Sequence, residues 1–587
     1  ATNQTDELRE NLYPDVKNRW RNQESTDARL TLAWGPSDSF NAKFKAYYSE
    51  YENDGPNWNV NMVCPEAPLM QQTQVPGTGQ VLPRGFYSCR RGESVGLPDV
   101  PDVLLPAATD PTYRYWNNGT PYMDQESQLY SLQLDWALSD SLALTSISAW
   151  LDLDNEYVDI FDFSQGLGSS LARQTYESFS QEFRLQSDYS GALNFSAGLY
   201  YADTERQFIS GQNAFNVGLL TADIFTGNGH DWDKEHDTDA ESWSTFGALH
   251  WNVTERLELT AGLRYSDDEK SGEIRIPYVH FLLQGVGFLT PGTVIKEGLE
   301  FEDDNWSPEL SANYALSDGA NLYLAYKTGY KAGGLDNSAL PSSALGSGDV
   351  SDLIYDSETG EGIEAGIKSD WLGRRLRVNA SVYHYVYEDL QVQQFDANTI
   401  QFSTFNAGEI TTQGAEAEMI YLPQLEGLQI HGALAWTDAS YSDTFINSEG
   451  QDLDGKDVAR SAEWAGHLGA LYDIPLGGSW NLGFSAVARF NSGYRLADEF
   501  NPLEQDSFWL YDGSIRLYSS DQTWDIALLG RNLGDEIVFY NAQARPFACA
   551  TDPSTGGCLP PVANRELDQG TPSSRGREYA LQLTYRY

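Results

Sequence analysis

The chain has 587 residues and a formal net charge of -48 at pH 7, from 85 Asp and Glu against 37 Lys and Arg. This balance excludes a nucleic-acid-binding protein, because a phosphate backbone requires a basic protein surface. No run of about 18 apolar residues occurs, which excludes membrane-spanning helices. Aromatic residues are abundant, with 34 Tyr, 25 Phe and 16 Trp.

From residue 26 onward, apolar and polar residues alternate in short segments. The alternating apolar sets, in chain order, include Leu30, Leu32 and Trp34; Phe40, Ala42, Phe44, Ala46 and Tyr48; Tyr130, Leu132, Leu134 and Trp136; Phe183 and Leu185; and Leu257, Leu259, Ala261, Leu263 and Tyr265. A period of two places such residues on one face of a strand. Each segment is about as long as a strand that crosses a membrane, ~9–11 residues.

The C-terminal segment has the clearest pattern. Its apolar face carries Tyr579, Leu581, Leu583, Tyr585 and Tyr587, and its polar face carries Ala580, Gln582, Thr584 and Arg586. An apolar face ending in aromatic residues suits a strand between lipid and a wet lumen. An amphipathic strand of a soluble sandwich has the same period, so this segment alone does not decide between the two.

The connections favour the membrane alternative. We count 19 strand segments, joined alternately by short turns, such as 35–38, 139–141 and 188–191, and by long connections, such as 52–124, 210–239, 273–304, 334–359 and 541–572. Short turns on one rim and long loops on the other are typical of outer-membrane barrels. We therefore predict an all-β fold: a transmembrane, antiparallel, up-and-down β-barrel over 26–587, preceded by a loop at 1–25.

The strand count indicates missing strands. The first and last predicted strands both run toward the short turns, so the total number of strands in this chain is odd. Bacterial barrels have even numbers of strands, and plugged transporters have 22. Since open sheet edges are not tolerated in lipid, we expect a missing N-terminal segment with three strands, a proteolytic nick, or a partner polypeptide. The polar start, ATNQTDELREN, contains no export signal, so we expect a mature or truncated sequence.

Several motifs follow one another in an order that resembles a known family. They are SQEFRLQS (180–187), GLYY (198–201), LTAGLRY (259–265), YKTGYKAGG (326–334), IEAGIKS (363–369), NAG (406–408), GAEAE (414–418) and GRNL (530–533). Together they resemble the barrel domain of TonB-dependent outer-membrane receptors, especially those of alphaproteobacteria. The resemblance covers residues 26–587. The TonB box and the plug domain that precede the barrel in this family are absent from the sequence.

The resemblance implies active import of a scarce nutrient across the outer membrane of a Gram-negative bacterium. Ferric siderophores, oligosaccharides, cobalamin and haem are the cargo classes of the family, and the TonB–ExbB–ExbD complex pulls on the plug. The plug would be in a missing segment or on a separate chain, and the barrel would contact outer-membrane lipid. No cofactor is implied. A passive porin-like channel and a structural or docking barrel in a larger assembly are the alternatives.

An enzyme is not expected. None of the seven His residues lies in HExxH spacing, and no GxSxG elbow or Walker loop is present.

Aromatic residues in the long loops are the candidate cargo contacts. These are Trp58, Tyr115, Trp116 and Trp232. Aromatic rings stack on sugars or aryl groups, or they pack loops together. The high negative charge would repel anionic siderophores and so slightly favours carbohydrate or cationic cargo.

Two further sets of residues are candidates in the loops. No firm metal site is expected, and the weak candidates are His230, Asp231, Asp233, Glu235 and His236, which equally suit a solvated acidic loop. The four cysteines form two local pairs in predicted external loops, which predicts the disulfides Cys64–Cys89 and Cys549–Cys558.

The last set of candidates lies on predicted lumen faces. It consists of Arg29, Arg184, Arg264, Arg377 and Arg516. In a complete receptor these side chains would pair with plug carboxylates, or with Asp and Glu of neighbouring strands.

Overall fold

A computed structural model describes residues 2–5, 23–54, 59–63, 71–74, 81–84, 99–107, 119–160, 168–213, 216–284, 290–336, 350–396, 401–447, 451–498, 503–544, 569–574 and 576–586. Within these residues, one antiparallel sheet holds 21 strands. Two of them are short, β1 (Thr2–Thr5) and β13 (Thr293–Ile295). The others are β2 (Gln23–Ser37), β3 (Phe40–Asp54), β7 (Tyr122–Ser139), β8 (Leu142–Ile160), β9 (Ser169–Ser187), β10 (Leu193–Asn213), β11 (Trp232–Asn252), β12 (Leu257–Ile276), β14 (Glu300–Ser317), β15 (Ala320–Lys331), β18 (Glu358–Trp371), β19 (Leu376–Glu388), β22 (Ile410–Tyr421), β23 (Leu428–Tyr441), β24 (Trp464–Pro475), β25 (Trp480–Arg495), β26 (Glu504–Ser519), β27 (Trp524–Arg531) and β30 (Glu578–Tyr585).

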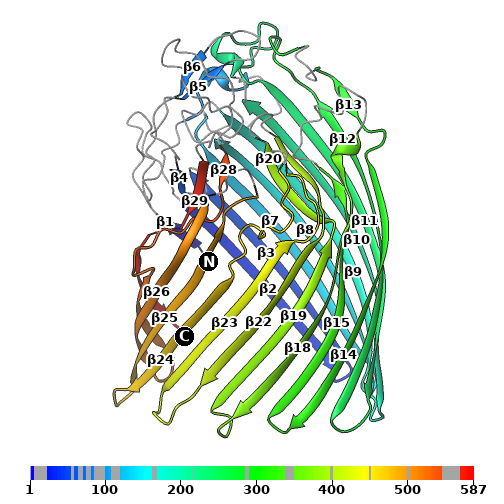
Figure 1. Cartoon of the computed structure of the whole chain (residues 1–587), viewed down its shortest axis with the longest axis vertical. Helices are drawn as coiled ribbons and strands as arrows, with labels where there is room; N and C mark the ends of the chain where they lie inside the picture. Colours follow the sequence, from blue (N-terminus) through cyan, green and yellow to red (C-terminus); the bar gives the residue numbers. More distant parts are fainter. Residues whose placement is uncertain are drawn as a thin grey trace.

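These strands form the wall of a barrel. Each long strand pairs with the next one in the chain, and the wall surrounds a lumen with short turns at one end and long loops at the other (Figure 1). The predicted all-β, up-and-down barrel is therefore confirmed, and the 19 long strands in the described residues correspond to the 19 predicted segments. No helix in the described residues is long and apolar enough to cross a membrane.

The period of two separates a lipid face from a lumenal face. Leu199 of β10 is 57% exposed on the outside, and Leu581 of β30 is 76% exposed. On β10, residues of the opposite parity, such as Arg206 and Ser210, therefore face the lumen. The register carries this assignment from strand to strand.

Above the lipid face, the strands continue with charged outward residues. Asp152, Glu177, Glu205 and Asp239 are register partners across β8, β9, β10 and β11. One step nearer the membrane, the indole of Trp150 donates a hydrogen bond to Glu177 at 2.9 Å. Charged side chains on the lipid face are destabilising, so this acidic row marks the part of the wall that has left the lipid.

The extended strands correct several predicted boundaries. The predicted 210–239 loop is shorter, because β10 continues to Asn213 and β11 begins at Trp232. The predicted strand at 374–395 divides into β19 and a separate strand β20, and the predicted loop at 1–25 contains β1, which pairs with β2. Outside the lipid, a strand can continue through backbone hydrogen bonds to its neighbour without an apolar outward face. Apolar alternation in the sequence therefore does not mark where these strands end.

Two hairpins leave the wall and fold into the mouth. One consists of β16 (Gly334–Leu335) and β17 (Ile354–Tyr355), and the other of β20 (Leu390–Asp396) and β21 (Gln401–Ala407). The second bends at Asp389, which has a φ of 54°. Its apolar residues pack against lumenal wall residues and against the connection that follows β23: the cluster contains Leu390, Val392, Phe405 and Ala407 of the hairpin, Ile410 and Tyr441 of the wall, and Phe445 and Leu453 of the connection. This packing holds the hairpin over the lumen, as Figure 1 shows for β20.

The remaining described elements lie in the loops. They are a sheet of β4 (Asn59–Val63), β28 (Gln543–Ala544) and β29 (Gln569–Ser573), a hairpin of β5 (Gln71–Gln74) and β6 (Val81–Arg84), and the 3₁₀ helices η1 (Asp102–Leu104), η2 (Val217–Leu219) and η3 (Ser351–Leu353).

The main sheet has two edges. Among the described residues, β30 pairs only with β27, and β2 pairs with β3 along its length but with the four-residue β1 only at its start. No ladder between β30 and β1 or β2 closes the sheet within these residues.

Candidate functional site

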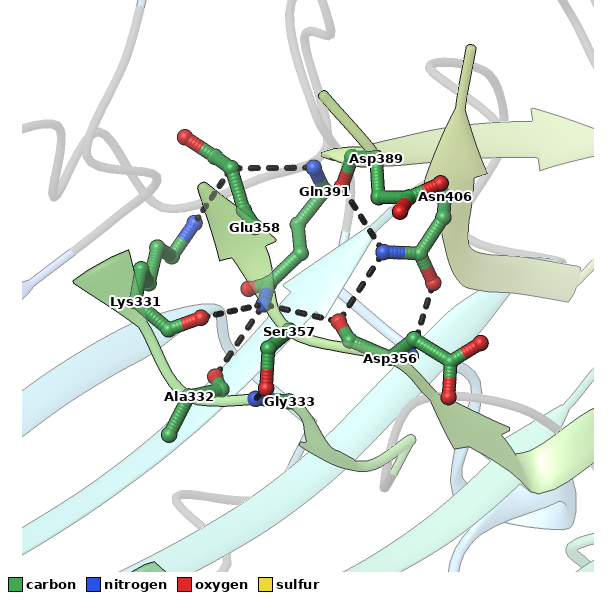
Figure 2. Close-up of polar contacts among 9 residues, drawn as sticks. All are labelled: Lys331, Ala332, Gly333, Asp356, Ser357, Glu358, Asp389, Gln391 and Asn406. Carbon is green, nitrogen blue, oxygen red and sulfur yellow. Dashed lines mark hydrogen bonds and ion pairs between the residues drawn. The ribbon is translucent and has the colours of Figure 1, made fainter. Parts of the chain in front are cut away.

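The two mouth hairpins are joined by a polar clasp, which we define as Gln391, Asn406 and the groups that they bind (Figure 2). The side-chain nitrogen of Gln391 donates to the carbonyl oxygens of Ala332 at 3.0 Å and Asp356 at 3.1 Å. Its backbone N–H donates to Glu358 at 3.0 Å. Gln391 therefore ties the start of β20 to the chain segments on both sides of the β16–β17 hairpin.

Asn406 forms the other half of the clasp. Its side-chain oxygen accepts a hydrogen bond from the backbone N–H of Asp356 at 2.8 Å, and its amide nitrogen donates to the carbonyls of Asp356 at 2.9 Å and Asp389 at 2.8 Å. One amide thus satisfies three backbone groups in two hairpins, which fixes their relative positions.

Further contacts fasten the clasp to the wall. The ammonium of Lys270 on β12 donates to the carbonyl of Gly333, and the hydroxyl of Ser357 donates to Asp303 on β14. At the other end of the hairpins, the backbone N–H of Thr404 donates to Asp336 at 2.8 Å. The hairpins are consequently held against the lumenal side of β12 and β14.

Beside them, the lumenal faces of β8 to β11 carry a basic and aromatic patch, which we call the mouth patch. Its members are Asn155, Tyr157, Tyr176, Arg206, Ser210, Lys234 and His236. Register places them in adjacent rows: Tyr157, Ala172, Ser210 and Lys234 are successive partners, as are Tyr176 and Arg206. His236 pairs with Phe208 of β10. Phe208 is two residues from Arg206, so both it and His236 face the lumen.

Burial decides the charge states in the mouth patch. Lys234 is 3% exposed, and this desolvation lowers the pKa of its ammonium to about 8, although the carboxylate of Asp336 opposes the shift. Desolvation, together with the positive charges of Lys234 and Arg206, lowers the pKa of His236 well below its usual value. His236 is therefore neutral at neutral pH, and the patch carries the charges of Arg206 and Lys234.

Several polar atoms of the mouth patch have no hydrogen-bond partner among the described residues. They are the side-chain oxygens of Asn155 and Ser210, Nε of Arg206 and Nε2 of His236. Buried polar groups in folded proteins are usually paired, so this concentration on one lumenal surface is unusual. Of these four residues only His236 was a sequence-based candidate, as a weak metal ligand, although the parity of Arg206 on a predicted strand could have placed it in the lumen.

The structure separates the five weak candidates for metal binding. Asp231 accepts hydrogen bonds from the backbone N–H groups of Asn216 at 2.9 Å and Val217 at 3.0 Å. Glu235 pairs with Arg275 at 3.0 Å, and His230 contacts Asp233 at 2.7 Å. In the described part of the chain, no group of three His, Cys, Asp or Glu residues comes together to hold a metal.

The interpretation of this segment as a solvated acidic loop is corrected as well. His230, Asp231, Asp233 and His236 are all buried, because the segment begins strand β11 and packs under η2 and the residues that follow β12. Trp232, a candidate cargo contact, is only 3% exposed and is the first residue of β11.

The lumenal arginines have partners on their own wall. Arg184 pairs with Glu182, Arg377 with Asp370 at 2.9 Å, and Arg516 with Asp525. These ion pairs match the alternative in which lumenal carboxylates of the barrel itself hold the guanidinium groups.

Two of the five arginines have a different environment. Arg264 donates to Ser266 at 3.1 Å and to Ser244, with its guanidinium 5.5 Å from the ring centre of Phe246. Arg29 is exposed on β2.

The remaining candidates lie outside the described residues. They are Trp58, Tyr115 and Trp116, and the cysteines of both predicted disulfides, Cys64–Cys89 and Cys549–Cys558. The cargo contacts and the disulfides at these positions stay predictions.

A recess lines the opposite part of the lumen. It has a volume of about 790 Å³ and extends over the lumenal faces of β18 to β26, where Glu364, Lys368, Glu416, His467 and Arg489 border it. Its polar border is typical of a surface that contacts water or another polar protein surface rather than lipid.

Comparison with known proteins identifies the family of this barrel. A family model described as "TonB dependent receptor-like, beta-barrel" matches residues 74–533. The chain belongs to this TonB-dependent receptor family. Curated relatives include the pesticin receptors of Yersinia enterocolitica, 24% identical over 221 residues, and of Yersinia pestis, 25% identical over 182 residues. These alignments cover 38% and 31% of this chain, and 28% and 24% of the two relatives.

Solved TonB-dependent receptors share the fold. The ferric yersiniabactin uptake receptor FyuA from Yersinia pestis has a TM-score of 0.67 at 15% identity, over 99% of this chain and 73% of that one. The siderophore receptor PiuA from Acinetobacter baumannii has a TM-score of 0.65 at 16% identity, over 100% and 76%. Members of the family are outer-membrane proteins of Gram-negative bacteria, and the lipid face described above places this barrel in that membrane.

Proposed function

We propose that this barrel belongs to a TonB-dependent importer that carries a scarce nutrient across the outer membrane. Family membership is the observation that carries the proposal. The clasped hairpins at the mouth support it, because they present a shaped surface on the extracellular side rather than a uniformly open pore. A ferric siderophore is the cargo class named for the neighbours FyuA and PiuA, while oligosaccharide, cobalamin and haem are the other classes to test.

The import cycle requires parts that lie outside the described barrel. We propose that a plug domain occupies the lumen beside the recess bordered by Glu364 and Arg489, and that the TonB–ExbB–ExbD complex acts on this plug. The plug and the remaining strands would come from a segment or chain other than the described residues. The unpaired edges of β2 and β30 support this, since lipid does not tolerate open ladders.

The barrel itself is proposed to make and break no bonds. Its role is to bind cargo at the mouth and to guide it past the plug, so no catalytic residue is assigned.

Uptake measurements in the native bacterium test the proposal. Uptake of labelled ferric siderophores, haem, cobalamin and oligosaccharides is compared between the parent strain, a strain lacking this receptor, and the parent treated with a proton uncoupler. We expect one cargo class to depend on both the receptor and the proton gradient. Receptor-dependent uptake that survives the uncoupler, with steady conductance in planar bilayers, would establish a passive channel instead.

A further inference from the structure

We infer that a groove on the lipid face of β11, β12, β14 and β15 holds one acyl chain of a zwitterionic glycerophospholipid, and that the turn containing Arg256 binds the headgroup of this lipid. The lipid comes from the periplasmic leaflet and stays with the receptor while the surrounding lipid exchanges. The inference concerns the outer wall of the barrel and does not depend on the proposed import function.

The groove is a depression in the outer wall with a volume of about 470 Å³, within the range of pockets that hold small molecules, about 300–1,000 Å³. Ala261 and Ala312 line it, and each of them lies directly between two leucines of neighbouring strands. These partners are Leu249 and Leu310 for Ala261, and Leu259 and Leu324 for Ala312. Because an alanine side chain ends at Cβ, the wall is low at both positions and the leucines stand around them.

The lining of the groove suits hydrocarbon. Leu249, Leu310 and Leu324 are exposed on the outside of the barrel, where the wall contacts the apolar interior of the bilayer. Thr260 and Ser311, which also line the groove, have the opposite parity, so their hydroxyls project to the lumen. An acyl chain in the groove contacts side chains beside it and beneath it, and these added contacts strengthen the dispersion attraction. The groove therefore retains a chain better than the flat wall does.

The position of the groove identifies the leaflet. Trp251, at one end, is the residue before the last of β11 and precedes the short turn 253–256. Tyr326 and Ile363, at the other end, lie in the middle of β15 and β18. Short turns of outer-membrane barrels lie on the periplasmic side, so the groove rises from that side toward the bilayer centre. The chain that enters it belongs to the periplasmic leaflet, which consists of glycerophospholipids.

The turn beside Trp251 has a fixed backbone. The hydroxyl of Thr254 accepts hydrogen bonds from the backbone N–H groups of Arg256 at 3.1 Å and Leu257 at 3.0 Å. The carbonyl of Arg256 accepts the backbone N–H of Ala315 at 2.8 Å. Arg256 is therefore held between β12 and β14, the two strands that carry the alanines of the groove.

The charges of this turn complement a zwitterionic headgroup. The side chain of Arg256 is exposed and forms no ion pair with a carboxylate of the described residues, and a guanidinium matches two phosphate oxygens at once. Glu255, the preceding residue, is exposed as well, so the turn presents one cation for a phosphate and one anion for an amine. Trp251 places an indole at the same rim, which is typical of residues at headgroup level.

Lipid binding by the receptor purified from its native outer membrane tests the inference. After delipidation in detergent, the receptor is titrated with dioleoyl phosphatidylethanolamine, dioleoyl phosphatidylglycerol or lipid A, and native mass spectrometry counts the bound lipids. The double variant Ala261→Leu, Ala312→Leu fills the groove. Its matched control is Ala486→Leu on β25, because Ala486 is exposed and shares the parity of the outward Phe484, away from the groove.

The headgroup is tested with Arg256→Gln. Its control is Arg374→Gln, which removes the same charge from another short turn, between β18 and β19.

We expect the wild type to bind one phosphatidylethanolamine more tightly than phosphatidylglycerol or lipid A. The double variant should weaken this binding about tenfold or more, since the buried apolar contacts of the chain are lost. Arg256→Gln should weaken it by a smaller factor, because the chain contacts remain. Both control variants should bind as the wild type does.

The inference fails if the wild type and the double variant bind the same number of lipids with the same affinity, or if Ala486→Leu loses as much. Equal or tighter binding of phosphatidylglycerol would overturn the headgroup assignment, and tighter binding of lipid A would overturn the leaflet. A dimer of the wild type that the double variant abolishes would assign the groove to a second copy of this chain. If the double variant does not assemble, Ala312→Leu alone decides, and unchanged lipid binding by it overturns the inference.

Discussion

At the scale of single residues, His236 makes the mouth sensitive to acid. Its pKa is lowered below the value in an open or unfolded chain, so the open state binds more protons below about pH 6.5. The contribution of His236 to the stability of the closed mouth should therefore be constant above this pH and fall as pH decreases through it. Hydrogen exchange of β11 and β16, corrected for intrinsic rates, should show increased opening at about pH 5 relative to about pH 7.

The variant His236→Gln should lose this difference, because glutamine does not titrate. Lys234, whose pKa is about 8, remains protonated over most of the range and adds little change below neutral pH. An acid response that persists in His236→Gln would assign it to other groups.

Gly414 shows why the wall needs glycine at one lumenal position. A Cβ there would lie 2.4 Å from the carbonyl oxygen of Trp436 and 2.5 Å from the hydroxyl of Tyr383, which also contacts Thr437 at 3.0 Å. We expect Gly414→Ala to destabilise the barrel by about 1–3 kcal/mol through overpacking. Gly329→Ala is the matched control, because its nearest atom, the carbonyl oxygen of Gly360, is 4.0 Å away.

The measurement is the temperature at which each variant loses its compact, fast-migrating form on a gel in SDS. A decrease for Gly414→Ala with no decrease for Gly329→Ala is expected. Equal behaviour of the two would mean that the ring of Tyr383 and the backbone at Trp436 both shift at little cost.

At the scale of elements, the clasp makes two hairpins behave as one. Asn406→Ala removes three hydrogen bonds to Asp356 and Asp389, each worth about 0.5–1.5 kcal/mol net. Both β16–β17 and β20–β21 should then exchange amide hydrogens faster, while β18 and β19 keep their protection. The control is Asn379→Ala on β19, which removes two hydrogen bonds away from the hairpins, one donated to Glu418 and one accepted from the backbone N–H of Ser369. Faster exchange of β20–β21 alone would show that the hairpins are independent.

The same elements mark how far the sequence predicts the structure. Strands were predicted where one face meets lipid, because only there does the apolar alternation of residues such as Leu30 and Leu32 have a physical cause. The mouth hairpins were missed, since Gln391 and Asn406 act through backbone carbonyls that no residue pattern reveals. Arg206 was not chosen, and His236 was chosen only as a weak metal candidate, because the environment of both side chains depends on their partners, and partners are a property of the folded chain.

At the scale of the whole molecule, charge is sorted by position rather than averaged. The outward face above the lipid is acidic from β8 to β11, Arg206 and Lys234 lie on the inside of the same strands, and Arg377 and Arg516 further along the lumen are neutralised by adjacent carboxylates. A barrel permits this arrangement because each strand separates its two faces every second residue. The net charge alone therefore does not describe the field that cargo meets in the lumen.

The open sheet leads to the last prediction. The edges of β2 and β30 present unpaired backbone groups within the described residues, and each such group in lipid costs several kcal/mol. We therefore expect the receptor from its native membrane to contain additional polypeptide that pairs with both edges. Intact mass with N-terminal sequencing should give one chain heavier than 65.4 kDa, or this chain with a second co-purifying polypeptide. A mass of 65.4 kDa with no partner would contradict this expectation and would mean that both edges are paired within this chain.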